Sequence, residues 1–64
     1  MFNIGKHIKQ IRKSKRMTQT EFGEVIGISQ NYLSEIEKGI CTPSLKTLSK
    51  IADRLNISIS KFLE

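Results

Sequence analysis

The sequence predicts a single all-α domain built from five short helices. Apolar residues recur at intervals of three and four positions in several segments of the 64-residue chain, which is the spacing of one face of an α-helix. Residues that begin or end helices, such as Ser, Thr, Asn and Gly, stand between those segments. A chain of this length has room for one domain, residues 1–64, and buries only about 60% of the surface that its unfolded form exposes.

The first helix is expected to run from about Asn3 to Lys15. Ile4, Ile8 and Ile11 form an apolar stripe along it. The basic side chains of this segment fall on the other faces, so most of them are expected to be solvated. His7 flanks the stripe and is expected at the boundary of the core.

The second helix is expected to begin at Thr18. Thr18 and Glu21 have the spacing of a capping box, in which each side chain accepts a hydrogen bond from the backbone N–H of the other residue. Gly27 supplies a left-handed residue that ends the helix at little steric cost. Gly23 is small where the chain must approach the next helix closely. The apolar face consists of Phe22, Val25 and Ile26.

The third helix is expected from about Gln30 to Lys38, with Ser29 as its N-cap. Leu33 and Ile36 face the core, which leaves polar side chains on the outward side. Two short helices joined by a tight glycine-containing turn, with exposed polar residues at the start of the second, fit a helix-turn-helix unit that reads DNA.

The fourth helix is expected from about Ser44 to Asn56. Pro43 forces its start, Ser44 or Thr42 caps it, and Asn56 is a plausible left-handed end. Its predicted buried face is Leu45, Leu48, Ile51, Ala52 and Leu55. A fifth helix, about Ser58 to Leu63, carries several apolar side chains in a short terminal segment.

The charge is uneven along the chain. The formal net charge is +5, and residues 1–16 hold six basic residues and no acidic one. Residues 17–40 hold four glutamates against one lysine. A basic domain suits a polyanion partner, whereas charge alone favours the alternative of a solvated, soluble surface. The helix-turn-helix pattern reverses that preference and favours a polyanion partner.

Several classes of function are not expected. Cys41 is the only cysteine and His7 the only histidine, so neither a disulfide network nor a metal site is predicted, and no cofactor is expected. Cys41 is interpreted as a small, half-buried filler. No catalytic constellation is present, so the chain is not expected to be an enzyme. Without a long apolar run or a signal region, a cytoplasmic location is predicted.

Nearly the whole chain, from Ile4 to Leu63, resembles the phage-repressor-type (Xre-like) helix-turn-helix family, whose fold is the five-helix lambda-repressor-like domain. The resemblance implies an ion pair between Arg12 and Glu37 that ties the first helix to the third. It also implies that Gln19 contacts a phosphate, which agrees with the unpaired N–H groups at a helix start. The matching positions are Gln19, Gly23, Gly27, Leu33, Ile36, Glu37-x-Gly39, Pro43-Ser44-Leu45 and Leu48-x-x-Ile51-Ala52-x-x-Leu55.

The DNA contacts expected from this pattern fall into two groups. The base-reading candidates are Gln30, Asn31, Ser34, Tyr32 and Glu35. The phosphate-binding candidates are Thr18, Gln19, Ser29, Lys38, Gly39 and Lys46. Tyr32 has the alternative of partial packing at the edge of the core. Glu35 departs from the family, which often has a neutral or basic reader there, and would have to accept from cytosine N4.

The implied function is sequence-specific binding to double-stranded DNA, as a transcriptional repressor that acts as a homodimer on a palindromic operator. In the family, the C-terminal region is often where two copies meet, so the expected dimer interface is Ile57, Ile59, Phe62 and Leu63. The alternative is that Ile59 and Phe62 merely close the core. The alternative function is a protein-interaction module, such as an antitoxin or the target of an anti-repressor.

Overall fold

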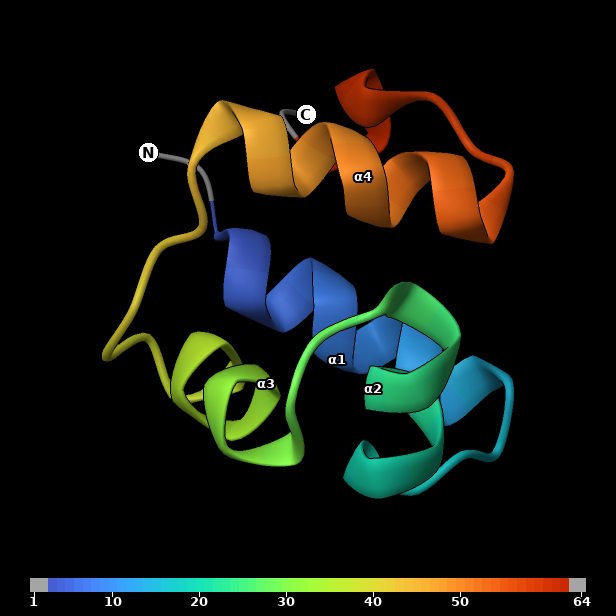
Figure 1. Ribbon diagram of the computed structural model, residues 1–64, viewed down its shortest axis with the longest axis vertical. Coiled ribbons are helices and arrows are strands. Elements are labelled where there is room, and N and C mark those ends of the chain that lie inside the picture. The colour runs from blue at the N-terminus through green and yellow to red at the C-terminus, as the bar shows by residue number, and fades with distance from the viewer. Residues whose placement is uncertain (1–2, 63–64) are drawn as a thin grey trace.

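The computed structural model describes residues 3–62, which form four α-helices and one 3₁₀ helix. The elements are α1 (Ile4–Ser14), α2 (Gln19–Ile26), α3 (Gln30–Glu37), α4 (Leu45–Leu55) and η1 (Ile59–Phe62). Figure 1 shows α4 across the top of the molecule and α2 and α3 at the bottom, with α1 between α4 and this lower pair. The α2 helix packs against α3 and α4, and α1 packs against α3 and η1. None of the described helices is long and apolar enough to cross a membrane.

The predicted all-α class is confirmed, but the expected fifth α-helix is wrong. The chain forms a 3₁₀ helix of four residues, Ile59–Phe62, in its place. A segment this short makes little more than one turn, and the tighter 3₁₀ form is common in such pieces. The all-helical arrangement around the helix-turn-helix unit is otherwise as expected.

Local capping residues set the helix ends as predicted. Thr18 Oγ1 accepts from the backbone N–H of Glu21 at 3.1 Å, and the Glu21 carboxylate accepts from that of Thr18 at 2.9 Å. Ser29 and Ser44 cap α3 and α4 through their hydroxyl oxygens. Gly27 ends α2 in the left-handed region with φ 79°. These bonds satisfy backbone donors that a helix start would otherwise leave unpaired.

The core lies where the four α-helices and η1 meet. Its members are Ile8, Phe22, Ile26, Leu33, Ile36, Leu48, Ile51, Ala52 and Phe62. Two residues expected on buried faces are exposed instead, Val25 by 37% and Leu45 by 67%. Both lie at the edge of their helix's apolar stripe, beside the buried residues rather than among them. Residue spacing gives the direction of a buried stripe but not its width.

The C-terminal element closes the core. The side chain of Phe62 is 0% exposed, so the prediction that it forms a dimer interface is wrong, because a fully enclosed ring offers no surface to a second copy. Ile57 and Ile59 are half-buried and pack against the same core. Leu63 lies outside the described residues.

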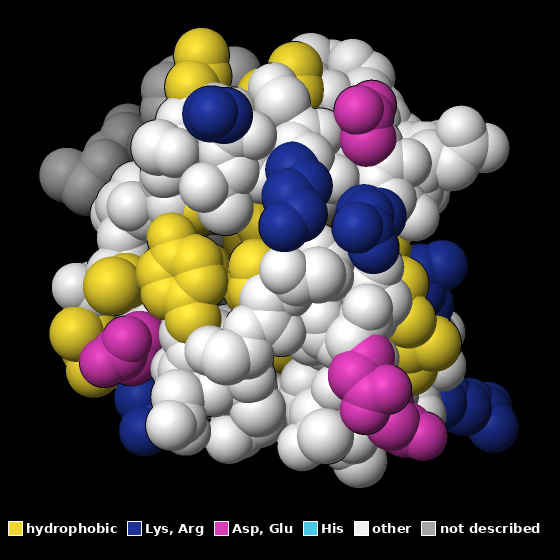
Figure 2. Space-filling model, in the orientation of Figure 1, with side chains coloured by type: hydrophobic (Ala, Val, Ile, Leu, Met, Phe, Trp, Pro, Cys, Tyr) yellow, Lys and Arg dark blue, Asp and Glu magenta, His cyan; other side chains and the backbone are white. Residues whose placement is uncertain are grey.

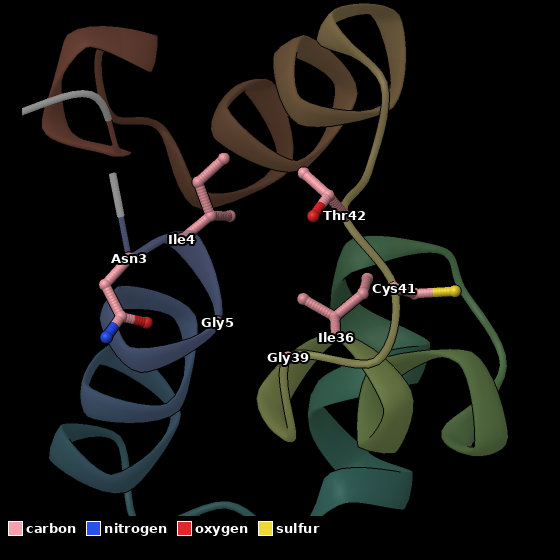
Figure 3. Close-up of a pocket in the computed structure, with 7 residues that line it drawn as sticks. All are labelled: Asn3, Ile4, Gly5, Ile36, Gly39, Cys41 and Thr42. Carbon is pink, nitrogen blue, oxygen red and sulfur yellow. The ribbon is translucent and has the colours of Figure 1, made fainter. Parts of the chain in front are cut away.

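Gly5 allows α1 to lie directly against the end of α3. A Cβ atom at this position would overlap the backbone carbonyl oxygen of Ile36 and lie 3.3 Å from the Cα of Glu37. Figure 3 shows Gly5 on the side of α1 that faces Ile36 and Gly39. The close approach brings the backbone of α1 to the end of α3, beside Glu37.

Replacing Gly5 with alanine should therefore destabilise the fold, although the same change in a helix usually stabilises it by up to about 1 kcal/mol. Because the new methyl group meets backbone rather than a flexible side chain, α1 must move away from α3. We expect a loss of about 1–3 kcal/mol in the free energy of unfolding, measured by urea denaturation. Gln10→Ala, at an exposed position of α1, should change it by less than about 0.5 kcal/mol.

Candidate nucleic-acid interface

The outward side of α3 carries the side chains expected to meet DNA bases. Gln30, Asn31 and Glu35 are exposed, whereas Ser34 and Tyr32 are half-buried. Leu33 and Ile36, at 0% and 1% exposure, hold the opposite side in the core. The helix therefore presents short amide and carboxylate groups to solvent on a rigidly packed element.

A chain of side-chain hydrogen bonds connects this outward side to the interior. Gln30 Nε2 donates to Gln19 Oε1 at 2.8 Å, and Gln19 Nε2 donates to Glu37 Oε1 at 3.2 Å. The Glu37 carboxylate also accepts hydrogen bonds from Nε and Nη2 of Arg12, at 2.8 and 3.0 Å. One continuous network thus joins residues of α1, α2 and α3.

The ion pair between Arg12 and Glu37 is largely withdrawn from solvent. The side chains are 13% and 3% exposed, and the two parallel bonds have the bidentate geometry that suits a guanidinium and a carboxylate. Arg12 Nη1 also donates to the carbonyl oxygen of Met17 at 3.0 Å, which ties the α1–α2 connection to the pair. The hydrogen bond to Glu37 raises the pKa of Arg12 above its ordinary value, against the opposing effect of burial.

The start of α2 has the groups expected of a phosphate contact. The first backbone N–H groups of a helix have no partner within it, and the positive end of the helix dipole favours an anion there. Gln19 is half-buried, and its Nε2 retains a second hydrogen after the bond to Glu37. The hydroxyl groups of Thr18 and Ser29 accept the capping bonds and keep their own hydrogens as donors.

The end of α3 and the start of α4 carry three of the predicted phosphate contacts. The backbone N–H of Gly39 donates to the carbonyl oxygen of Ile36 at 3.1 Å, so this donor is already used in ending the helix. A backbone N–H has one hydrogen, so a phosphate bound by Gly39 would share that hydrogen with the carbonyl oxygen of Ile36. Lys38 beside it is exposed, as is Lys46 in the first turn of α4.

The exposed basic residues of α4 lie along one face of that helix. Lys46, Lys50 and Arg54 follow one another at intervals of four residues. Figure 2 shows basic side chains along α4, with acidic side chains both close to them and over the lower part of the view. Lys50 Nζ donates to the carbonyl oxygen of Gly27 at 3.1 Å. This bond places a cation at the negative end of α2 and pairs a carbonyl that the helix leaves free.

Sequence reasoning missed two parts of this site. The hydrogen bonds that join Gln19 to Glu37 and to Gln30 have no local signature, since they depend on the placement of two helices. Gly5 did leave a signal, because a glycine inside a helical pattern is unfavourable and usually has a packing reason.

Cys41 and His7 lie apart from this network. Cys41 is half-buried as predicted, with its sulfur 3.9 Å from a carboxylate oxygen of Glu35. His7 is half-buried at the edge of the core, and its Nδ1 has no hydrogen-bond partner. Among residues 3–62, no group of three or more His, Cys, Asp or Glu side chains is placed to hold a metal ion.

The helix-turn-helix family model matches residues 8–62. The chain belongs to the helix-turn-helix family. The match extends from α1 to η1 and therefore includes every residue of the network between Arg12 and Gln30.

Two relatives of this helix-turn-helix chain come from Bacillus phage phi105. The ImmF control region 10 kDa protein is 46% identical over 57 residues, which are 89% of this chain and 63% of that protein. The immunity repressor protein is 40% identical over 57 residues, or 89% of this chain and 40% of that protein. The chain thus spans only part of the length of these relatives.

The helix-turn-helix fold is also seen in a crystal structure of the biofilm-formation regulator SinR in complex with DNA. It superposes with a TM-score of 0.83 at 37% sequence identity, and the match covers 95% of this chain and 98% of that one. The restriction-modification controller protein C.AhdI from Aeromonas hydrophila has the same fold, with a TM-score of 0.83 at 23% identity.

Proposed function

We propose that the chain is a sequence-specific double-stranded DNA-binding transcriptional regulator that acts as a repressor. The observation that carries this proposal is the outward side of α3, where Gln30 and Asn31 are exposed at the start of a helix whose other side is fixed in the core. Two further findings support it: the relationship to a phage immunity repressor and the structural match to a regulator bound to DNA.

The α3 helix lies in the major groove and reads base edges. Gln30 and Asn31 carry amides that can bond adenine at both N6 and N7, and a good pair of this kind is worth about 1–3 kcal/mol of discrimination. Ser34 adapts to a base edge or a phosphate, and Tyr32 contacts the sugar-phosphate backbone or a thymine methyl group. Glu35 accepts from cytosine N4, because its carboxylate has no hydrogen to donate.

Phosphate contacts set the register of the protein on the duplex and contribute much of its affinity. The start of α2, with Thr18 and Gln19, grips one phosphate through backbone N–H groups and the free amide hydrogen of Gln19. The hydroxyl of Ser29 and the ammonium groups of Lys38 and Lys46 supply the other contacts. All three lie at helix ends, where side chains reach the backbone of the duplex without entering the groove.

The regulator binds as a homodimer to a roughly palindromic operator, with two α3 helices in successive major grooves about 34 Å apart. Ile57 and Ile59 keep part of their apolar surface exposed beside the core and form the contact between copies. The alternative function, a protein-interaction module, would use the apolar C-terminal segment to bind its partner. It is weakened because Phe62 fills the core of its own chain.

Selection of bound sites from a random DNA pool tests this function. The selected sites should contain two inverted copies of one short sequence, separated by about one helical turn. Gln30→Ala should then lose about 1–3 kcal/mol on the selected site and relax the preference at one position of each half-site. Binding to random DNA should change little.

Lys38→Ala is the matched comparison for this experiment. It should weaken binding to selected and random DNA alike and reduce the slope of affinity against salt by about one unit, since one phosphate contact is lost. Equal losses on the two DNAs for Gln30→Ala would contradict the assignment of α3 as the reading helix. A pool that yields no preferred sequence would contradict the proposed function itself.

A further inference from the structure

We propose that Glu37 is a positioning residue for base recognition, because through Gln19 it fixes which end of the Gln30 amide meets the DNA. This inference rests on the proposed DNA-binding function and deepens it. Glu37 itself lies with its side chain 3% exposed, so it acts from beneath the reading surface.

The geometry links the buried carboxylate to the exposed amide in two steps. Glu37 Oε1 accepts from Gln19 Nε2 at 3.2 Å, and Gln19 Oε1 accepts from Gln30 Nε2 at 2.8 Å. Arg12 donates to both carboxylate oxygens, from Nε to Oε2 at 2.8 Å and from Nη2 to Oε1, the oxygen that also accepts from Gln19, at 3.0 Å. Gln19 is therefore held between a buried acceptor and the reading residue.

The chemistry of the carboxylate gives this chain a direction. The two ends of a glutamine amide have nearly the same shape, so by packing alone Gln19 could face either way. A carboxylate only accepts hydrogen bonds, and a guanidinium only donates them. Gln19 must therefore turn its NH₂ group to Glu37 and its oxygen to Gln30. Gln30 must then donate to that oxygen from its own NH₂ group.

The direction determines what Gln30 has left for a base. One hydrogen of its Nε2 is used on Gln19, which leaves one N–H donor and the whole carbonyl oxygen as an acceptor. Adenine presents one donor, N6–H₂, and one acceptor, N7, in the major groove, so the two sets are complementary. Guanine presents two acceptors, N7 and O6, and its O6 would oppose the free oxygen of Gln30. The network thus favours adenine over guanine at this position.

The decisive experiment changes Glu37→Gln and measures base preference rather than affinity alone. The substitution keeps the size of the side chain but removes its charge and gives it one NH₂ end. With that NH₂ group in the place of Oε1, the side chain offers Gln19 a donor and gives up the bond from Arg12 Nη2, so Gln19 is no longer held to one orientation. Dissociation constants are measured on the selected site and on the same site with A·T replaced by G·C at the position where Gln30→Ala abolishes the preference. The unaltered protein should prefer A·T by roughly 5- to 150-fold, and Glu37→Gln should bring this ratio to within about threefold of one.

A merely structural role for Glu37 predicts a different result. Loss of folded protein lowers the apparent affinity for both DNAs by the same factor, so the ratio would stay unchanged. Glu24→Gln makes the same chemical change at an exposed position of α2 and should leave the ratio as it is. If Glu37→Gln proves too unstable, the double variant Arg12→Leu/Glu37→Leu removes the acceptor without leaving a buried charge unpaired, and its ratio should also fall towards one.

The possible outcomes separate this inference from the function on which it rests. An unaltered protein that binds the two DNAs equally would overturn the proposed reading by Gln30. An unaltered protein that prefers A·T, together with a folded Glu37→Gln or double variant that keeps the same ratio, would overturn the positioning role while the DNA-binding function stands. A ratio that falls only in the Glu37 variants supports the inference.

Discussion

Replacing Phe62 with alanine is expected to lower the free energy of unfolding by about 3–5 kcal/mol. The ring is fully buried, so its removal loses the free energy that its burial contributes to folding. It also leaves a cavity where η1 closes over α1 and α4. A domain of this length is stabilised by roughly 3–10 kcal/mol in total, so much of the variant should be unfolded at 37 °C. Urea denaturation followed by circular dichroism measures the loss.

The same experiment distinguishes a core role from an interface role for this residue. A core residue stabilises each copy by itself, so the loss should be equal at low and high protein concentration. A residue that held two copies together would give a loss that grows with concentration, because mass action stabilises a dimer. Lys61→Ala, at the exposed neighbouring position, should change the free energy of unfolding by less than about 0.5 kcal/mol.

The parts of the fold that were predictable from the sequence are those fixed by neighbouring residues. The capping box of Thr18 and Glu21 acts across three positions, and Gly27 and Asn56 adopt left-handed conformations that their own chemistry favours. Such signals need no knowledge of the tertiary structure. The beginnings and ends of α2, α3 and α4 could therefore be placed within a residue or two.

Burial and close contacts that depend on how two helices pack were less predictable from the sequence. Leu45 has the same spacing to Leu48 that buried residues share, yet it is 67% exposed because it lies at the edge of the contact. Similarly, the close approach at Gly5 depends on the crossing of α1 and α3, which residue spacing does not describe. The geometry between helices decides both cases.

The candidate interface shows the same division. The outward position of Gln30 follows from the inward positions of Leu33 and Ile36 on one short helix, so the sequence was sufficient for it. The bonds of Gln19 connect residues 11 and 18 positions apart and require α2 and α3 to be in place. Family resemblance supplied the Arg12–Glu37 pair, but the side chain that links this pair to Gln30 became visible only in the structure.

Arg12→Leu is expected to cost about 3–5 kcal/mol in the free energy of unfolding, measured by urea denaturation. The substitution leaves the carboxylate of Glu37, 3% exposed, with the amide of Gln19 as its remaining side-chain partner in the network. An unpaired charge that is withdrawn from water loses most of its hydration without compensation. The connection between α1 and α2 loses its bond to the carbonyl oxygen of Met17 as well.

The double variant Arg12→Leu/Glu37→Leu should be more stable than either single variant, because it removes both charges together and leaves apolar groups of similar size. A double-mutant cycle then measures the coupling between the two residues. Lys13→Leu, at the exposed position beside Arg12, is the matched control and should change stability by less than about 0.5 kcal/mol. If the losses of the two single variants simply added in the double variant, the pair would not act as a unit. The large effect of Arg12→Leu would then have to come from lost packing of the arginine side chain instead of the stranded carboxylate.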